Sequence, residues 1–228
     1  MAGSTTGPGE AGKRKESGHP HVELERGRLL LVGTGAFAVT ALPSWIALMQ
    51  TWYGWSIRVC LTHSAERLVS REALAAVTQA PVEGPEWRTE RGVTPHQELA
   101  EWPDLVLVAP ATTNFVAKCA LGMPDSLALS TVLSTRAPVV LAPSLPEGAL
   151  ARPAVQRNLR TLTEDGFHVA PMQRVRSVHK GRLTNAAAGM PDIFTTLRFV
   201  ARAVAEHAAE QAADDGLSGP DGTTAASA

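Results

Sequence analysis

Short apolar runs alternate with longer amphipathic or alanine-rich stretches along most of this chain. The pattern predicts strands at residues 28–33, 56–62, 105–109, 138–142 and 168–170, and helices at 36–52, from about Ser64, and at 114–121, 153–165 and 191–213. The strand runs are almost wholly apolar, which is typical of parallel strands buried on both faces. We therefore expect an α/β fold with a Rossmann-like (flavodoxin-like) parallel sheet and helices on both faces.

This fold is expected to form one domain. Residues 1–25 and 214–228 are rich in Gly, Ser, Pro and charge and poor in apolar residues, so we predict disordered tails there. The domain then spans residues 26–213. Pro43 lies inside the first helical stretch and marks its first turn or a kink.

Composition narrows the possible functions. The chain has 21 basic and 22 acidic residues, a balance that argues against a nucleic-acid or membrane-surface role driven by bulk charge. No apolar run reaches about 18 residues, and the amino terminus does not resemble a secretory signal. Cys60 and Cys119 cannot form a disulfide framework and fit a reducing cytoplasm. No histidines or cysteines have metal-ligand spacing, so we predict no metal.

Ligands of such sheets bind beyond the carboxyl ends of the strands, so the first loop to consider follows the first strand. Gly33-Thr34-Gly35-Ala36 allows a sharp turn and a close approach of backbone amides to an anion. It departs from the dinucleotide-binding fingerprint, because Val39 stands where a small residue is expected and the later acidic residue is missing. The loop either binds a phosphate or is a plain tight turn.

Two further loops offer polar groups at the same edge. Thr62 and Ser64 follow the second strand and either contact a phosphate or cap a helix. Pro110-Ala111-Thr112-Thr113-Asn114 follows a later strand, and its small residues leave room for a flat ring. Its hydroxyls and amide suit the polar atoms of a cofactor, or Asn114 caps the next helix. Several loops of this kind on one sheet favour a mononucleotide site.

Three segments carry a resemblance to a known family. His96-Gln97-Glu98-Leu99 through Asp104, Ala109–Asn114 with its continuation to Asp125, and Pro153–Gly166 occur in the expected order on the expected elements. Together they resemble the homo-oligomeric flavin-containing cysteine decarboxylases, over roughly residues 28–192. That family includes phosphopantothenoylcysteine decarboxylase and the peptidyl-cysteine decarboxylases of lanthipeptide, linaridin and thioamitide biosynthesis.

The resemblance implies FMN as cofactor and His96 as the catalytic acid/base. Histidine suits this role because its ordinary pKa lies near working pH. In the family, FMN takes two electrons from a cysteine residue, carbon dioxide leaves, and an enethiolate remains. The residues implied in FMN binding are Gly33, Thr34, Gly35, Ala36, Thr62, Ser64, Leu68, Pro110, Ala111, Thr112, Thr113, Asn114 and Ser144.

Two departures from the family pattern concern the substrate. The family's substrate motif aligns with Pro143–Leu150, where Pro146 replaces the asparagine that contacts the substrate carboxylate. Candidates for holding the substrate are Leu145, Pro146, Arg152 and Asn185, with Arg157 as an alternative to Arg152. The late cysteine that reduces the coenzyme A intermediate is absent from residues 181–185. The segment around 175–185 is expected to act as a mobile lid.

The sequence therefore predicts FMN-dependent oxidative decarboxylation of the C-terminal cysteine of a ribosomally synthesised precursor peptide, giving an aminoenethiol. The alternatives are a phosphopantothenoylcysteine decarboxylase of coenzyme A biosynthesis and a non-catalytic FMN-binding regulatory or scaffold subunit. Flavin prenyltransferases share the fold but match the His96 and Asn158 segments poorly. The resemblance further implies a cytoplasmic homo-oligomer, with trimers assembled into a dodecamer and FMN at the subunit boundary.

Overall fold

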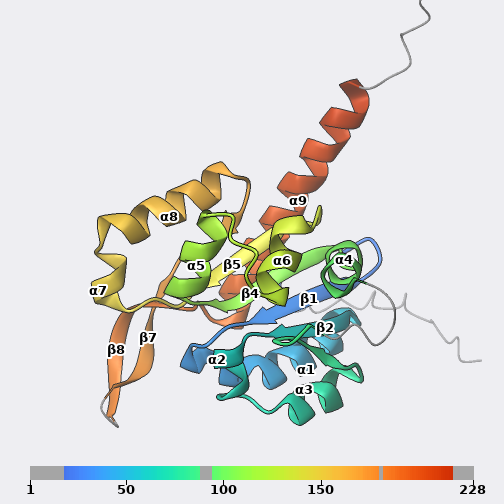
Figure 1. Ribbon diagram of the computed structural model, residues 1–228. Helices are drawn as coiled ribbons and strands as arrows, with labels where there is room; N and C mark the ends of the chain where they lie inside the picture. Colours follow the sequence, from blue (N-terminus) through green and yellow to red (C-terminus); the bar gives the residue numbers. More distant parts are fainter. Residues whose placement is uncertain (1–17, 88–93, 180–181, 218–228) are drawn as a thin grey trace, which may run out of the picture.

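A six-stranded parallel sheet forms the centre of the computed structural model, which describes residues 18–87, 94–179 and 182–217 (Figure 1). The strand order is β3-β2-β1-β4-β5-β6, the order of Rossmann-like sheets. The strands are β1 (Arg28–Gly33), β2 (Ser56–Leu61), β3 (Val82–Glu83), β4 (Leu105–Ala111), β5 (Val139–Pro143) and β6 (His168–Val169). The predicted fold class is thereby confirmed.

Helices cover both faces of the sheet (Figure 1). One face carries η1 (Phe37–Ala41), α1 (Leu42–Tyr53), α3 (Arg71–Thr78) and α9 (Ile193–Leu217), and the other carries α4 (Pro95–Glu101), α5 (Thr113–Ala120), α6 (Leu127–Ser134) and α8 (Pro153–Glu164). Side chains alternate along β1: Leu29 and Leu31 enter the first core, and Leu30 and Val32 the second. Within the described residues, no helix combines the length and hydropathy needed to cross a bilayer.

The register of the central strands brings several loops to one edge. Gly33 pairs with Leu61, so β1 and β2 end at the same level. A bulge in β4 lets Ala111 pair with Pro143, which places the loop after β5 beside the loop after β4. The short helices α2 (His63–Glu66) and α7 (Glu147–Leu150) also start at this carboxyl edge. The sheet therefore gathers the polar loops on which the sequence analysis focused.

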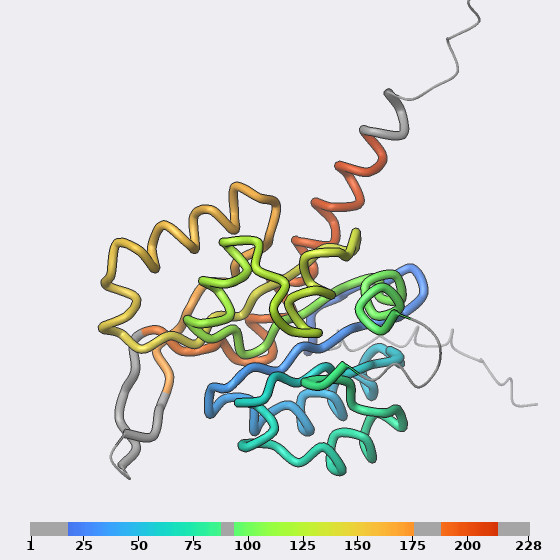
Figure 2. The backbone as a smooth tube through the Cα atoms, in the orientation of Figure 1, coloured from blue at the N-terminus to red at the C-terminus, as the bar shows by residue number. Residues whose placement is uncertain are grey.

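The largest difference from the predicted elements is an antiparallel hairpin, formed by β7 (Gln173–His179) and β8 (Arg182–Gly189). The predicted strands did not include these residues, and the segment around 175–185 was expected only to act as a mobile lid. Figure 1 shows β7 and β8 leaving the body of the domain, and Figure 2 shows α9 leaving it at the other side. Its base is tied to the sheet, because the N–H of Leu145 donates to the carbonyl of Ala188 at 2.9 Å. The hairpin is thus anchored at the carboxyl edge of the sheet.

The ends of the domain also differ from the prediction. Residues 18–25, expected in the disordered tail, pack on the domain: Val22 is buried and His19 stacks on Trp52. Tyr53 donates a hydrogen bond to the carbonyl of Pro20. At the other end α9 continues to Leu217, past the predicted limit of 213. Residues 1–17 and 218–228 of the two predicted tails lie outside the described residues.

Asp192 caps the amino end of α9. Its carboxylate accepts hydrogen bonds from the backbone N–H and the hydroxyl of Thr195, at 3.0 and 2.9 Å. The backbone bond is the main cause that holds the pKa of Asp192 below its ordinary value. Since α9 supplies Ile193, Leu197 and Val200 to the core, this cap contributes to the stability of the whole domain.

We expect Asp192→Ala to lower the free energy of unfolding by about 1 kcal/mol at neutral pH, because a capping acceptor is lost. Asp192→Ser should retain most of the stability, since serine also caps helices. The deficit of the alanine variant should shrink as the pH falls through the folded-state pKa, because protonation removes the charged acceptor from the wild type. Urea unfolding of the three proteins measures this, and equal stability of the alanine and serine variants would contradict it.

Candidate active site

A buried hydroxyl joins two of the predicted cofactor loops. Thr34, only 1% exposed, donates from Oγ1 to the carbonyl of Pro110 at 2.7 Å. The same oxygen accepts the N–H of Thr112 at 3.0 Å. These bonds use the hydroxyl inside the protein, so Thr34 positions the loop after β4 against the loop after β1.

Thr34→Val should separate these loops, because it leaves the buried carbonyl of Pro110 and the partly buried N–H of Thr112 without their partner. Such a loss costs about 1–3 kcal/mol. We expect a lower melting temperature and weaker retention of FMN, with Thr34→Ser restoring both because it keeps the hydroxyl. Thermal unfolding and flavin titration check this result, and a valine variant that matches wild type in both would refute the role given to Thr34.

A glycine allows the loops after β1 and β2 to touch. A Cβ placed on Gly35 would lie 2.2 Å from Cβ of Ser64, far closer than two carbon atoms can approach. Gly33 is also tightly enclosed, because its Cβ would lie 2.7 Å from a methyl of Leu61. The two glycines therefore let the backbone of both loops close around a common space.

That space is a cavity of about 420 Å³ at the carboxyl edge of the sheet. Six of the residues expected to bind the cofactor line it: Thr34, Gly35, Thr62, Ser64, Thr112 and Asn114. Sequence reasoning did not assign a cofactor role to the other lining residues, which are Leu61, His63, Pro85, Phe115, Lys118, Asp125, Ser126, Ala128 and Leu129. The cavity therefore combines hydroxyl and amide groups with an apolar wall, a lining that suits a flat polar cofactor.

The helices around the cavity begin differently from the prediction. Thr112 caps α5, since its hydroxyl accepts from the N–H of Phe115 at 3.4 Å, and Asn114 lies within the first turn. The helix after β2 starts at His63, with Thr62 rather than Ser64 at the capping position. Asn114 and Ser64 are thus not used as helix caps, and both line the cavity.

Charged groups are present on two sides of the cavity. Lys118 and Asp125 form an ion pair of 2.5 Å in its wall. His63 lies 3.4 Å from Glu86, and both side chains are about three-quarters exposed. His63 is not among the residues predicted to bind the cofactor, and only its three-dimensional position shows that it lines the cavity. Within the described ranges, no cluster of three or more His, Cys, Asp or Glu side chains is placed to hold a metal.

Seven residues expected to bind the cofactor do not line the cavity: Gly33, Ala36, Leu68, Pro110, Ala111, Thr113 and Ser144. Several of these support the loops instead. Ala111 is fully buried, and its carbonyl accepts the N–H of Ser144 at 2.9 Å. Leu68 is 40% exposed. Direct cofactor contact by these residues stays a prediction.

None of the four predicted substrate residues is among the described residues that line the cavity. Leu145 is 4% exposed and packs against Val155 and Ala188, so its side chain belongs to a small core. Pro146 precedes α7, and Arg152 is exposed at the start of α8. Asn185 pairs with Arg176 in the hairpin, but its side chain lies outside the described part of the structure.

His96 occupies a different cavity. It lies in the first turn of α4, which is held by the buried Leu99 and by an ion pair of 3.0 Å between Arg58 and Glu98. The His96 ring meets the edge of Trp87, with 5.2 Å between ring centroids. Its Nδ1 is buried and has no hydrogen-bond partner among the described residues.

The cavity that His96 lines, about 840 Å³ in volume, is at the amino edge of the sheet. Asp104 and Pro138, which directly precede β4 and β5, line it together with Val204 and His207 of α9. A catalytic acid/base must reach the cofactor, but one chain does not bring His96 and the Pro110–Asn114 loop into the same cavity. The seven-residue strand β4 separates them, and such a strand spans about 20 Å.

The chain matches the flavoprotein family over residues 17–205 and belongs to that family. This confirms the resemblance found in the sequence. Among solved structures, it is similar to the FMN-dependent cysteine decarboxylase SpaF, with 30% identity and a TM-score of 0.65, covering 79% of this chain and 97% of that one. The FMN-dependent cysteine decarboxylase TvaF from thioviridamide biosynthesis is 34% identical, with a TM-score of 0.59, covering 63% and 88%.

A relative found by sequence similarity is a protein of coenzyme A biosynthesis. The coenzyme A biosynthesis bifunctional protein CoaBC of Bacillus subtilis (strain 168) is 34% identical over 163 residues, which are 69% of this chain and 40% of that protein. The chain thus spans less than half the length of this relative. The chain is therefore similar both to FMN-dependent cysteine decarboxylases and to a bifunctional protein of coenzyme A biosynthesis.

Proposed function

We propose that this protein uses FMN to oxidatively decarboxylate the C-terminal cysteine of a ribosomally synthesised precursor peptide, giving an aminoenethiol. The observation that carries the proposal is the carboxyl-edge cavity, where polar groups from three strand–helix loops meet. Its supports are the membership in the flavoprotein family and the similarity to SpaF and TvaF.

The residues of the cavity fit FMN. Its volume of about 420 Å³ lies within the usual range of cofactor sites. Gly35 and Ser64 bring the loops after β1 and β2 into close contact at the cavity, and backbone amides and hydroxyls of such loops suit a phosphate. The hydroxyl of Thr62 and the amide of Asn114 offer further hydrogen bonds. FMN, when bound, would supply the two-electron oxidation.

The protein's own part in the reaction is to bind, orient and move protons. His96 is the proposed acid/base group, because an imidazole can accept or donate a proton near neutral pH. Since His96 and the FMN cavity are separate within one chain, we propose that a second copy brings His96 to the cavity. A homo-oligomer with FMN at the subunit boundary meets this requirement. The family resemblance supports trimers and a dodecamer as its form.

The coenzyme A pathway is the second candidate, favoured by the similarity to CoaBC. Its final reduction needs a reactive thiol. Burial raises the pKa of Cys60 and of Cys119 to about 12, and both side chains are free and buried. Neither can readily supply a thiolate at neutral pH. We therefore favour the peptide reaction, which leaves the enethiol unreduced, and we place it in the cytoplasm, where free thiols persist.

The decisive experiment incubates the FMN-loaded protein with peptides that end in cysteine and with phosphopantothenoylcysteine. The proposal expects a peptide product lighter by carbon dioxide and two hydrogens, detected by mass spectrometry. Turnover of phosphopantothenoylcysteine alone would move the protein to the coenzyme A pathway. If neither the peptides nor phosphopantothenoylcysteine loses carbon dioxide while FMN is bound, the non-catalytic flavoprotein would be favoured.

A further inference from the structure

Four exposed arginines lie on α8, at its start and on β7, the elements that follow β5 in the chain. Arg152, Arg157, Arg160 and Arg174, here called the arginine strip, are exposed side chains of α8, of its start and of β7. None of the four forms an ion pair with any described residue, whereas Arg26, Arg58, Arg71 and Lys118 are each paired with a carboxylate.

The charge of this region differs from that of the rest of the chain. Residues 147–189 contain seven lysines and arginines and three acidic residues, although the whole chain has 21 basic and 22 acidic residues. Two of the three acidic residues, Glu164 and Asp165, lie at the far end of α8. The start of α8 and the hairpin therefore form the basic part of a chain that is otherwise acidic on balance.

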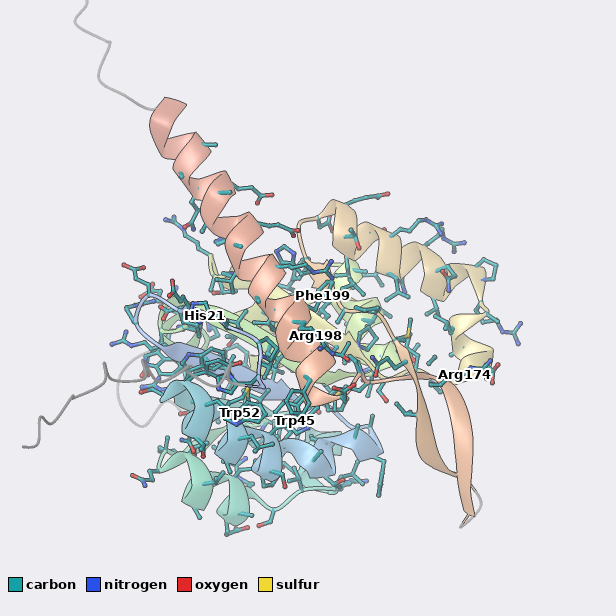
Figure 3. The ribbon with its side chains drawn as sticks, turned by 180° about the vertical axis from the view of Figure 1, so that it is seen from behind. His21, Trp45, Trp52, Arg174, Arg198 and Phe199 are labelled. Atoms are coloured by element: carbon teal, nitrogen blue, oxygen red, sulfur yellow. The ribbon has the colours of Figure 1, made fainter. Side chains whose placement is uncertain are left out.

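The strip is connected to the candidate active site through the backbone. Ser144 donates its N–H to the carbonyl of Ala111, next to Thr112 in the cavity lining, and Leu145 donates to Ala188 in the hairpin. α7 packs between α8 and β8. Figure 3 shows Arg174 beside α7 at the base of the hairpin, while Arg198 lies apart on α9. The inference requires that a peptide whose last residue enters the cavity extends along these elements.

Two arginines of the strip lie on one face of α8. Arg157 and Arg160 are three residues apart on α8, so they project on the same side, opposite the buried Val155 and Leu162. An extended peptide segment spans about 3.3 Å per residue, so a few residues can contact several arginines. Guanidinium groups pair with carboxylates in bidentate geometry.

We propose that the arginine strip selects substrate peptides with acidic side chains in the residues that precede the C-terminal cysteine. The inference rests on the proposed peptide reaction, and it names the class of peptide. Charge complementarity at an exposed surface mainly raises the rate of encounter and the specificity. The effect should therefore appear in kcat/KM and in peptide affinity, and should weaken at high salt.

The test compares pentapeptides that end in cysteine and carry two glutamates, two glutamines or two lysines just before it. All keep the same C-terminal carboxylate, so differences report the side chains. For the FMN-loaded protein, we expect kcat/KM for the glutamate peptide to exceed that for the glutamine peptide by roughly tenfold, and the lysine peptide to be slowest. Affinity is measured separately by fluorescence anisotropy with unreactive peptides that end in serine.

Variants assign the effect to the strip. In Arg152→Gln/Arg157→Gln/Arg174→Gln, the glutamate preference should fall to about twofold or less, because most of the charge attraction is removed. Arg198→Gln removes one positive charge from the labelled site on α9 (Figure 3) and should leave the preference unchanged. Replacing the same three of the four strip arginines by glutamate should make the lysine peptide the better ligand.

The outcomes separate this inference from the proposed function. Equal turnover of the three peptides would overturn the inference and leave the decarboxylase standing. Turnover of none of them would instead defeat the proposed function. If only phosphopantothenoylcysteine reacts and the triple variant slows it, the strip serves a phosphate, and the acidic-peptide proposal is wrong.

Discussion

Replacing His96 by asparagine is expected to abolish decarboxylation of a cysteine-ending peptide while FMN remains bound. Loss of a general acid/base typically lowers a rate by about 10²–10⁴-fold. Asparagine keeps a polar side chain of moderate size beside Trp87, so the substitution removes proton transfer more than packing. FMN should be retained, because His96 does not line the carboxyl-edge cavity. Peptide mass spectrometry and flavin absorbance of the same sample measure both quantities.

His207→Asn is the matched control, since His207 lines the same amino-edge cavity as His96. It is expected to keep most of the activity. If the two variants lose activity equally, the cavity as a whole matters and His96 has no special role. If His96→Asn matches wild type, the acid/base assignment is wrong.

The sheet could be predicted because its strands are short, continuous apolar runs. Leu29–Val32 and Leu105–Val108 are buried on both faces, and no polar alternation obscures them. The hairpin was not predicted because its strands lack such a continuous apolar run. In β7 and β8 the residues Gln173–His179 and Arg182–Gly189 contain no such run, because the hairpin pairs with itself outside the main sheet. The helix α4 has seven residues, which is too short to give a clear helical period.

The candidate site was predictable where the chain order determines position. The loops after β1, β2 and β4 must meet at the carboxyl edge of a parallel sheet, and six of their residues do line one cavity. Contacts made across the fold carry no local signal. The position of Lys118 and Asp125 in the wall, and the approach of Pro85 from beyond β3, depend on how α5, α6 and β3 pack. The separation of His96 from the Pro110–Asn114 loop follows from the seven-residue length of β4. A match of short sequence segments does not reveal this distance.

Substituting alanine for Gly35 is expected to weaken FMN binding by about tenfold to hundredfold. The added Cβ would lie 2.2 Å from Ser64, so one of the two cofactor loops must move away. Overpacking of this kind costs about 1–3 kcal/mol, and each 1.4 kcal/mol is a tenfold change in affinity. Flavin titration followed by fluorescence measures the dissociation constant. Gly148→Ala in α7 is the control, because a Cβ there would meet nothing within 4 Å.

The Gly35→Ala chain still carries His96, which gives a direct test of the shared site. At an FMN concentration too low to load the Gly35→Ala chain, assembly with His96→Asn chains, which retain the FMN cavity, should restore part of the activity that each variant lacks alone. Restoration requires His96 of one copy to serve the cavity of another. Mixed assemblies that contain both chains but stay inactive, while each variant keeps its fold, would mean that both parts of the site must belong to the same chain. The oligomeric arrangement proposed above would then be untenable, because only a movement within one chain could bring His96 past β4 to the cofactor.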